Sequence, residues 1–573
     1  MSDINSQTVA LIGGGPAALF LIKHITAKKI KPRKIIIFEQ NSHLGMGMPY
    51  GVSGAGKEHV ANISANEIPE LITDLEDFLS KNEQSGFGDY YTTGKINRDQ
   101  VVPRLVLGKY LENQFGILIK MAKSQNIEVL TLVNTKVIDI QSNPDQSYTV
   151  IAGGDKKYGA DVVILTTGHQ WTKSFEGKHK GWFDSPYPPS KFVETTNFPV
   201  AVKGASLTAV DIIKTLSRLN GRFSGSKDNQ LEYTLNDDAQ DFRIHLYSLS
   251  GLLPALRFHS EDEAFSTEWK MSLKEIYDYK KTHGGFVDLD YVFDINFKNV
   301  IEKKDPELYL EIKDLTIEEF VEKMMKLRKE LDSFQLFKAE YTEAEKSIKR
   351  HQSITWKEAL TSFSYAMNYP AKHFSAEDML RLTKTLMPLI SIIIAALPQS
   401  SYREIIALYD AEVISLSNVD AGSVVEPHEE EGAIYRFKNN DGKKKELIYK
   451  MYVDATGQRA MNYNDLPFES LKKEGAVASG YLSFKNAENA VELIKDGNEM
   501  IMKGDHDHFY LKVKGLSIND NFQALDSYGK VRENLYIMSV AYIGGLNPDY
   551  SGLDFCDTAA EIITDSLKKD WAM

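Results

Sequence analysis

Three consecutive glycines in the stretch LIGGGPAALF, residues 11–20, constrain the fold most strongly. The residues before them, Thr8 to Ile12, form a short apolar, β-branched run that is typical of a buried strand. The residues after them, Ala17 to Ile25, have the spacing of a helix that packs on a sheet. The glycines therefore occupy a strand-to-helix turn, where the free N–H groups of the helix N-terminus bind the pyrophosphate of a dinucleotide.

The turn matches the dinucleotide-binding pattern G-x-G-x-x-A through Gly13, Gly15 and Ala18. Gly13 permits the tight turn, Gly15 leaves room for the pyrophosphate, and Ala18 allows close helix–strand packing. Glu39 ends the next apolar run, about 20 residues further on, where a carboxylate accepts ribose hydroxyl groups. The pattern predicts an adenine dinucleotide and leaves both NAD and FAD open. A glycine-rich packing turn with a solvated Glu39 is the structural alternative.

A second strand–turn–helix unit follows in FPVAVKGASLTAVDIIKTL, residues 198–216. Its turn contains Gly204 but has Ser206 where the second glycine is usual. The Cβ of Ser206 would crowd a pyrophosphate, whereas its hydroxyl can donate a hydrogen bond to one, and Thr208 adds a second hydroxyl near the helix N-terminus. The unit is therefore either a modified NAD(P)H site or a vestigial site that preserves the fold.

The end of the next predicted strand bears on the choice of nicotinamide. The run FRIHLYSLS, residues 242–250, is followed by no basic residue before Arg257. An arginine at this place suits the 2′-phosphate of NADPH. NADH, NADPH and no nicotinamide therefore all stay open.

Composition sets broad limits. The chain has 573 residues, 42% apolar and 26% charged, as in an ordinary globular protein. Its formal net charge of −13 argues against nucleic acid as a partner. Cys556 is the single cysteine, which excludes an intrachain disulfide or a paired-cysteine redox centre and indicates a reducing compartment. We find no metal-ligand spacing.

The N-terminal residues have no apolar core of the kind that a secretory signal needs, so we expect a cytoplasmic protein. The most apolar run, Leu386 to Leu397, is shorter than the roughly 20 residues that span a bilayer and is expected to be a buried helix. We therefore expect no integral membrane segment.

Further along the chain, residues 133–140 and the strands after them are expected to return to the first sheet. ADVVILTTGH at 160–169 and LIYKMYVDATGQ at 447–458 both read as a buried strand ending in a small-residue turn. From about 256 to 400 the pattern is helical and rich in Lys and Glu. The chain then closes with a strand and a helix.

The chain resembles the bacterial FAD-NAD(P)-binding flavoprotein family, which is itself similar to class B flavin monooxygenases and amine N-hydroxylases. The resemblance rests on GMGMPYG at 45–51 with HVANISANEIP at 59–69, VPRLVLGKYL at 102–111, and TTGH at 166–169. The segment 102–111 resembles the family's Arg-x-x-x-Gly-x-Tyr-Leu helix, and the segment 166–169 resembles its Ala-Thr-Gly turn. The resemblance covers roughly residues 7–255 and 400–565, whereas the helical stretch between them matches only loosely.

This resemblance implies FAD in the first site and NADPH or NADH in the second. Gly552 and Leu553 are expected to begin a helix whose N-terminal N–H groups face the flavin, the alternative being an ordinary C-terminal helix with a glycine at its start. His169 is the candidate catalytic residue. The other residues expected to bind the cofactors are Gly13, Gly15, Pro16, Ala17, Ala18, Glu39, Gly45, Gly47, Asn62, Arg104, Val137, Thr167, Gly168, Gly204, Ser206 and Thr208.

The expected fold class is α/β, with two Rossmann-like dinucleotide-binding domains, the FAD domain being discontinuous, and a helical insertion. The expected domains are residues 1–190 for the first part of the FAD-binding domain, 191–255 for the NAD(P)-type Rossmann subdomain, 256–400 for the helical insertion, and 401–573 for the return to the nucleotide-binding domains.

The expected function is that of an FAD-dependent, NAD(P)H-using oxidoreductase, a monooxygenase that N-hydroxylates a small amine or amino acid. Two alternatives stay open. One is an FAD-dependent dehydrogenase or oxidase with a vestigial nicotinamide site, which Ser206 and the missing arginine favour. The other is a non-catalytic, flavin-bound sensor or scaffold.

Overall fold

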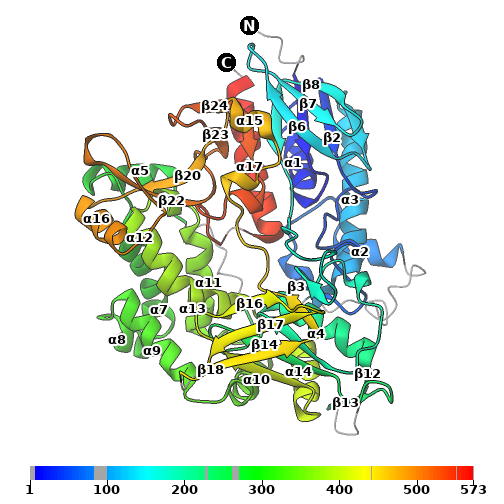
Figure 1. The fold of residues 1–573 in the computed structure, drawn as a ribbon. Coiled ribbons are helices and arrows are strands. Elements are labelled where there is room, and N and C mark those ends of the chain that lie inside the picture. The colour runs from blue at the N-terminus through cyan, green and yellow to red at the C-terminus, as the bar shows by residue number, and fades with distance from the viewer. Residues whose placement is uncertain are drawn as a thin grey trace. The chain divides into compact units, whose positions relative to one another are not determined.

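The computed structural model describes residues 7–82, 98, 100–225, 230–260, 270–439, 442–549 and 551–571. The chain divides into two compact units (Figure 1). The first consists of Met1–Gln170, Ala371–Ala376 and Ala460–Met573, and the second of Trp171–Pro370 and Glu377–Arg459. The expectation of a discontinuous N-terminal nucleotide-binding domain is therefore confirmed.

The first unit contains a six-stranded sheet in the order β23–β24–β9–β1–β2–β5, parallel except for β23 at one edge. Every residue of β1 and β9 is buried, as expected for central strands of a parallel sheet covered on both faces. The strands are β1 (Thr8–Ile12), β2 (Lys34–Phe38), β5 (Glu128–Leu132), β9 (Val162–Leu165), β23 (Gln523–Leu525) and β24 (Val531–Ile537).

Helix α1 (Pro16–Ala27) packs against both α3 (Arg104–Ser124) and α17 (Gly552–Trp571). Figure 1 shows α1, in blue, beside α17, in red. All residues of α1 from Ala17 to Ile22 are buried, which is the pattern of a helix enclosed on every side. The last helix of the chain therefore covers the first.

The expectation that residues 133–160 return to the main sheet is wrong. They form a separate antiparallel sheet of β6 (Val137–Ser142), β7 (Tyr148–Ala152) and β8 (Lys156–Ala160). In β7 the buried residues alternate with half-buried ones, as in an antiparallel sheet with one face packed on a core. The ring of Tyr158 in β8 lies 5.3 Å from that of Phe38 in β2, so the small sheet packs onto the large one.

The remaining elements of the first unit are short. They are β3 (Val60–Ser64), α2 (Leu75–Ser80), β4 (Val101–Pro103), α15 (Glu469–Lys473), β20 (Ser479–Ser483), α16 (Ala487–Lys495), β21 (Ile501–Lys503) and β22 (Phe509–Leu516). Strands β3 and β4 pair antiparallel, as do the neighbours in the sheet β20–β22–β21.

The second unit contains a five-stranded parallel sheet in the order β10–β19–β11–β14–β15. Alternate residues of β11 enter different cores, because successive side chains of a strand point to opposite faces. Val200 and Val202 pack with helix α4 (Leu207–Asn220), whereas Ala201 packs with Tyr435 and Tyr449 of a small antiparallel sheet, β16–β18. The strands are β10 (Trp182–Phe183), β11 (Pro199–Lys203), β14 (Arg243–Ser248), β15 (Ile414–Asn418), β16 (Val424–Pro427), β17 (Ala433–Lys438), β18 (Lys444–Tyr449) and β19 (Met451–Asp454). A further hairpin pairs β12 (Gly221–Gly225) with β13 (Leu231–Leu235).

The expected helical region is confirmed between β14 and α14 (Gln399–Asp410). Within the run from Leu386 to Leu397, residues Met387–Ile394 form α13, in which Leu389 and Ile390 are buried and Ser391 is exposed. The helices are α5 (Leu273–Thr282), α6 (Leu289–Phe293), α7 (Asn299–Lys304), α8 (Pro306–Ile312), α9 (Ile317–Lys329), α10 (Ser333–Arg350), α11 (Thr355–Met367), α12 (Ala376–Arg381) and α13 (Met387–Ile394). Of the helices that the structure describes, none is long and apolar enough to cross a membrane.

The two units repeat one topology. The strand order β9–β1–β2–β5 of the first corresponds to β19–β11–β14–β15 of the second. Each unit also forms a three-stranded antiparallel sheet directly before the strand that pairs with its first strand. The helical region of the second unit stands where the first unit has residues 39–103, between the second parallel strand and the next helix of the nucleotide-binding fold.

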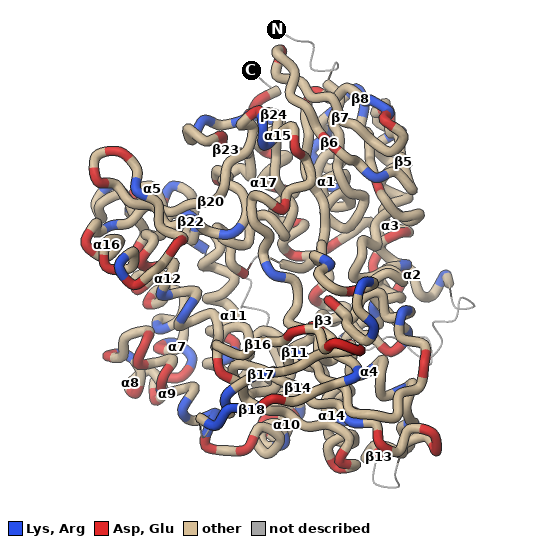
Figure 2. The backbone as a smooth tube through the Cα atoms, viewed as in Figure 1, with Lys and Arg blue, Asp and Glu red and all other residues tan. Residues whose placement is uncertain are grey.

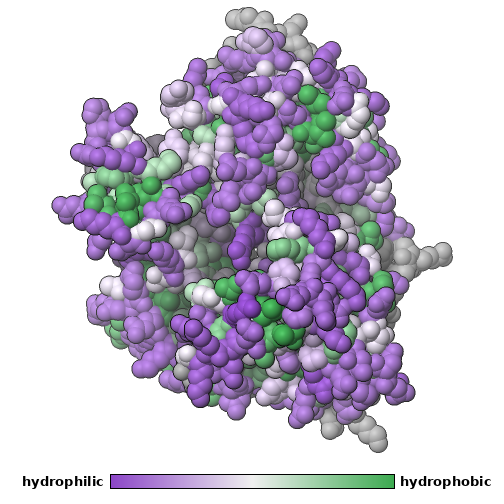
Figure 3. Space-filling model, viewed as in Figure 1, coloured by the Kyte–Doolittle hydropathy of each residue, from purple (hydrophilic) through white to green (hydrophobic). Residues whose placement is uncertain are grey.

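The surface carries charges of both signs. Figure 2 shows Lys and Arg interspersed with Asp and Glu along the chain. Figure 3 shows a face that is mainly hydrophilic, with hydrophobic patches scattered over it. Many large apolar side chains lie inside the two units, where they form the cores described above, whereas others such as Val52, Val193 and Tyr528 are exposed.

Candidate functional site

The glycine turn of the first unit is closed by backbone contacts that only glycine permits. Gly13 has a φ of +121° and donates its N–H to the carbonyl of Phe38, at 2.9 Å. A Cβ on Gly13 would lie 2.5 Å from the carbonyl oxygen of Thr166. The hydroxyl of Thr166 donates to the carbonyl of Gly13, at 2.8 Å. The turn thus joins the ends of β1, β2 and β9, and a side chain at residue 13 would separate them.

Glu39 stands at the end of β2, as the sequence predicts, and is 6% exposed. Its Oε2 accepts the N–H of Gly14 at 2.9 Å, and its Oε1 accepts the N–H of Asn41 at 2.7 Å. The side-chain amide of Asn41 also donates to Oε1, at 2.9 Å. A carboxylate has about four acceptor positions, so about one remains for a ribose hydroxyl group. Glu39 therefore holds the backbone of the glycine turn in place at the predicted dinucleotide site.

Two of the segments that carry the family resemblance, 45–51 and 102–111, contact each other through their glycines. Gly45 donates its N–H to the carbonyl of Gly14 at 2.7 Å, and a Cβ on Gly45 would lie 2.7 Å from the carbonyl oxygen of Leu111 in α3. A Cβ on Gly108 in α3 would lie 2.0 Å from the carbonyl oxygen of Tyr50. Glycines on both sides therefore let the loop at 45–51 lie directly between the glycine turn and α3.

Helix α1 starts at the turn without a side-chain N-cap, and Pro16 occupies its first position. The N–H groups of the first helical turn have no intrahelical acceptor. Gly15 contributes to this opening because a Cβ there would lie 3.3 Å from the Cα of Gly47. These features fit FAD: a cradle of glycines faces an uncapped, positive helix N-terminus.

An open cavity lies over this turn within the first unit. It brings together these predicted residues: Gly13, Gly15, Pro16, Ala17, Glu39, Gly47, Val137, Thr167, Gly168, His169, Gly552 and Leu553. Ala18, Gly45, Asn62 and Arg104 do not line it. Ala18 is fully buried behind the turn, and the Nε of Arg104 donates to the carbonyl of Val60 at 3.0 Å.

The strand end at Thr167 is tied to the C-terminal part of the chain. The hydroxyl of Thr167 donates to the Oγ of Ser539 at 3.0 Å, and the hydroxyl of Ser539 donates to the carbonyl of Thr167 at 2.6 Å. Gly168 and His169 follow as exposed cavity-lining residues. Nothing in this geometry assigns His169 a chemical step, so its catalytic role stays a prediction.

Several cavity residues were not among the predicted site residues. Tyr50 belongs to the segment 45–51, which carries part of the family resemblance, whereas Pro467 and Phe468 come from a segment without a recognisable motif. Burial raises the pKa of Tyr50, and burial followed by the charge of Asp554 raises the pKa of Cys556 to about 12. Both groups are therefore neutral near pH 7, and Cys556 supplies no thiolate nucleophile.

The glycine turn of the second unit repeats the geometry of the first. Gly204 has a φ of +116°, donates its N–H to the carbonyl of Tyr247 at 2.7 Å, and would place a Cβ 2.4 Å from the carbonyl oxygen of Ala455. Ser206 precedes α4 with a φ of −96°, which suits any residue, and its side chain does not cap the helix. Serine therefore replaces the second glycine without backbone strain.

The remaining positions of the second turn also have counterparts. Ser248 follows Tyr247 as Glu39 follows Phe38, so a hydroxyl stands where the first unit has its carboxylate. Its Oγ accepts the N–H of Gly251 at 3.0 Å. The hydroxyl of Thr208 lies next to Gly457: a Cβ built on Gly457 would be 3.5 Å from its Oγ1.

Glu39 offers a direct test of the first turn. In Glu39→Gln the amide group must place an N–H against a backbone N–H of Gly14 or Asn41, and the buried mismatch costs about 1–3 kcal/mol. We expect a lower melting temperature and weaker FAD binding, measured by differential scanning calorimetry and flavin fluorescence. Glu128→Gln is the control, because Glu128 is 61% exposed and pairs only with Lys34, on the neighbouring strand, among the ion pairs of the described residues. If Glu39→Gln keeps the stability and the FAD affinity of the wild type, the role of Glu39 in ordering the first turn and binding FAD is contradicted.

Comparison with known proteins supports the first site. Residues 10–170 match the family model described as FAD-NAD(P)-binding, and residues 272–394 match the YdhS-like middle domain. The first match confirms the predicted resemblance and the FAD and NAD(P) cofactor class, and with them the expectation of a flavin-dependent oxidoreductase. The second match coincides with the helical region α5–α13.

The chain is 24% identical over 481 residues to the uncharacterized protein YdhS of Escherichia coli (strain K12), covering 82% of this chain and 86% of that protein. Among solved structures it is similar to the FAD-bound cadaverine monooxygenase DfoA of Erwinia amylovora, at 11% identity and a TM-score of 0.45, covering 99% of this chain and 95% of that one. It is also similar to the lysine monooxygenase NbtG of Nocardia farcinica, at 12% identity and a TM-score of 0.40, covering 98% and 99%. These two structural likenesses are too distant to carry an argument about activity.

Proposed function

We propose that the protein is an FAD-dependent, NAD(P)H-using monooxygenase that N-hydroxylates a small amine or amino acid. The observation that carries the proposal is the repeated turn: Gly13 and Gly204 share one backbone geometry, each at the start of an uncapped helix. Two such turns in one chain suit a flavin site and a nicotinamide site. The amine substrate rests on the family resemblance alone.

In this proposal each group at the first turn has a separate task. The N–H groups at the start of α1 hold the pyrophosphate, and Glu39 holds the ribose. Leu553 and Phe555, which are almost fully buried, form apolar cavity walls together with Met538 and Val540 and keep water away. The bound FAD supplies hydride acceptance and, once reduced, electron transfer to oxygen.

The dehydrogenase or oxidase reading remains the second candidate. Ser206 and the lack of a basic side chain directly after Ser248 favour it, since both depart from a usual NADPH site. In that case the second turn preserves the fold without binding a nicotinamide. A substrate would then reduce the flavin directly.

The proposal is tested by aerobic turnover with a panel of small amines and amino acids. We expect NAD(P)H oxidation to rise with one class of amine and to yield a hydroxylated product that carries one oxygen atom from labelled O₂. Gly204→Ala is expected to retain flavin and to lose NAD(P)H-driven product. Product formation without NAD(P)H, or substrate oxidation without oxygen insertion, would contradict the monooxygenase proposal and favour the second candidate.

The residue after β14 is expected to influence the choice of nicotinamide. Ser248 presents no negative charge to a 2′-phosphate, unlike a carboxylate at the same place. In Ser248→Glu we expect kcat/KM with NADPH to fall at least about tenfold more than kcat/KM with NADH, because like charges then meet. Ser224→Glu adds the same charge at an exposed site of β12 and is the control. If kcat/KM falls equally with NADPH and NADH in Ser248→Glu, the proposal that residue 248 lies near the 2′-phosphate is contradicted.

A further inference from the structure

We propose that Asp557 is a positioning residue for the FAD site: by binding Lys23 and His24 it fixes the first turn of α17 beside α1 and sets the affinity of the cavity for FAD. The proposal rests on FAD binding in the first unit. It concerns a side chain outside the nucleotide-binding motifs and outside the cavity lining.

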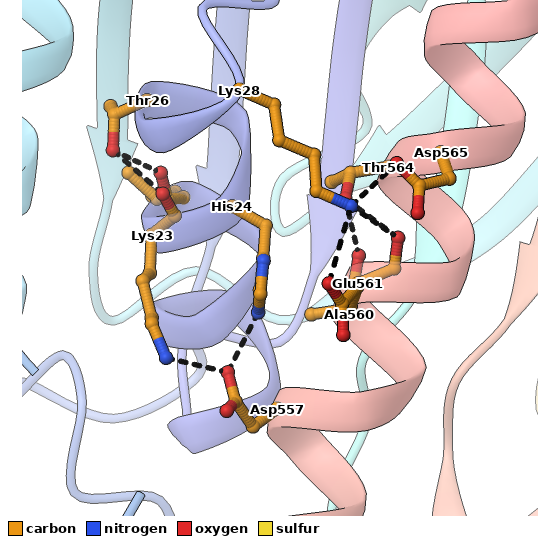
Figure 4. Close-up of polar contacts among 10 residues, drawn as sticks. Lys23, His24, Thr26, Lys28, Asp557, Ala560, Glu561, Thr564 and Asp565 are labelled. Carbon is orange, nitrogen blue, oxygen red and sulfur yellow. Dashed lines mark hydrogen bonds and ion pairs between the residues drawn. The ribbon is translucent and has the colours of Figure 1, made fainter. Parts of the chain in front are cut away.

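The contacts are drawn in Figure 4. One oxygen of Asp557, Oδ1, lies 2.8 Å from the Nζ of Lys23 and 2.7 Å from the Nε2 of His24. The three side chains are only 27%, 19% and 12% exposed, in the order Asp557, Lys23, His24. Burial alone would raise the pKa of Asp557, but the hydrogen bonds from His24 and Lys23 lower it, so the carboxylate stays charged near neutral pH.

The helices that Asp557 joins are parallel. Lys23 and His24 meet residue 557, and Lys28, further along α1, meets Asp565, further along α17. Both helices therefore begin at the same end, and this end is the cavity. Residues 15–17 line it from the start of α1, and residues 552, 553, 555 and 556 line it from the start of α17.

This arrangement has an electrostatic consequence. Two parallel helices place their positive N-terminal ends side by side, where they repel each other and attract an anion. An ion pair that links the helices close to these ends holds them together. Asp557 directly follows the cavity-lining Cys556, so its attachment to α1 determines where the first turn of α17 stands.

The decisive experiment compares Asp557→Asn with Asp565→Asn. Asp565 also links α17 to α1, with its Oδ1 2.5 Å from the Nζ of Lys28, but it is 62% exposed and lies about two helical turns further from the cavity. The apoproteins are titrated with FAD and binding is followed by flavin fluorescence. We expect the Kd to rise about tenfold in Asp557→Asn and less than about twofold in Asp565→Asn.

Two further measurements separate positioning from general destabilisation. Amide hydrogen exchange of the apoprotein is expected to increase at residues 552–557 in Asp557→Asn, with the rest of α17 unchanged. Lys23→Met is expected to raise the Kd by about threefold alone and by nothing more in the Asp557→Asn background, since both act through one contact. Lys23→Met also serves as the test variant if Asp557→Asn does not fold.

An FAD Kd in Asp557→Asn within about twofold of wild type, with normal folding, would overturn the proposal. Additive effects of Lys23→Met and Asp557→Asn would also overturn it. Failure of the proposed function appears differently: the wild-type protein would bind FAD but neither accept electrons from NAD(P)H nor oxygenate an amine, and the comparison of Kd values would still stand.

Discussion

Gly13→Ala is expected to purify without flavin. The new Cβ would lie 2.5 Å from the carbonyl oxygen and 2.8 Å from the carbonyl carbon of Thr166, both backbone atoms that have no rotamer to change. The φ of +121° adds backbone strain of about 1–3 kcal/mol for any residue with a Cβ. The turn must then open between β1 and β9, which removes the cradle for the pyrophosphate. Flavin absorbance per mole of purified protein measures the loss.

Two alanine substitutions provide the controls for this expected loss. Gly116→Ala lies in α3, where a Cβ would meet nothing within 4 Å, and is expected to stabilise the helix by about 0.5–1 kcal/mol with flavin content unchanged. Gly204→Ala meets the same obstruction as Gly13→Ala, but in the second unit, and is expected to retain flavin. Full flavin content in Gly13→Ala would contradict the assignment of FAD to the first turn. Loss of flavin in Gly204→Ala alone would instead assign FAD to the second turn.

Glu340→Ala is expected to destabilise the helical region by about 3–5 kcal/mol, because it leaves the buried Arg328 without its carboxylate and removes one of the two carboxylates that contact the buried Lys357, the other being Glu343. Glu340, in α10, accepts from the Nη1 of Arg328 at 2.5 Å and from the Nζ of Lys357 at 3.3 Å. The side chains of Arg328, Glu340 and Lys357 are 6%, 8% and 2% exposed. Urea-induced unfolding followed by far-UV circular dichroism measures the effect.

The control for Glu340 is an exposed pair in the same region. Glu311 lies 2.9 Å from Lys323 and is 63% exposed, so Glu311→Ala is expected to cost less than about 1 kcal/mol. Equal effects of the two substitutions would show that the buried network contributes nothing beyond surface charge.

The same network predicts the response of the helical region to acid. Burial alone would raise the pKa of Glu340, but the charges of Lys357 and Arg328 lower it below its ordinary value of 4.5. A carboxylate with a depressed folded pKa stabilises the protein fully above its unfolded pKa. This contribution is lost as the pH falls from 4.5 through the folded pKa, and Glu340→Ala is expected to lack that part of the acid transition.

The local parts of the fold were predictable because their signals are local. The apolar run at Thr8–Ile12, the glycines after it and the carboxylate at Glu39 lie within one βαβ unit, and each appears where its pattern predicts. The second unit was equally visible at Gly204. Short-range periodicity is sufficient when a strand, a turn and a helix follow one another directly.

The assignment of strands to sheets was less predictable. Residues 137–160 form strands as expected but pair with each other, since no local pattern names the partner of a strand. The alternation of buried and half-buried residues in β7 marks a one-sided antiparallel sheet, but it is a property of the folded strand and was not a signal in the sequence.

The candidate site shows the same limit at the level of single residues. Motif residues such as Gly15 and Thr167 reach the cavity, but Asn62 and Arg104 do not line it, although they belong to the resembling segments. Pro467 and Phe468 reach it from a segment without a motif, and Asp557 acts through a contact between residues 534 positions apart. Such contributions depend on tertiary packing.

The proposed function requires that the first unit hold a flavin and that a nicotinamide bound to the second unit reduce it. Anaerobic addition of NADPH, and separately of NADH, to the flavin-loaded protein tests it most directly, with candidate amines present. We expect rapid bleaching of the visible flavin absorbance in the wild type and slow or no bleaching in Gly204→Ala. A wild-type protein that binds flavin yet is bleached by neither coenzyme would contradict the account.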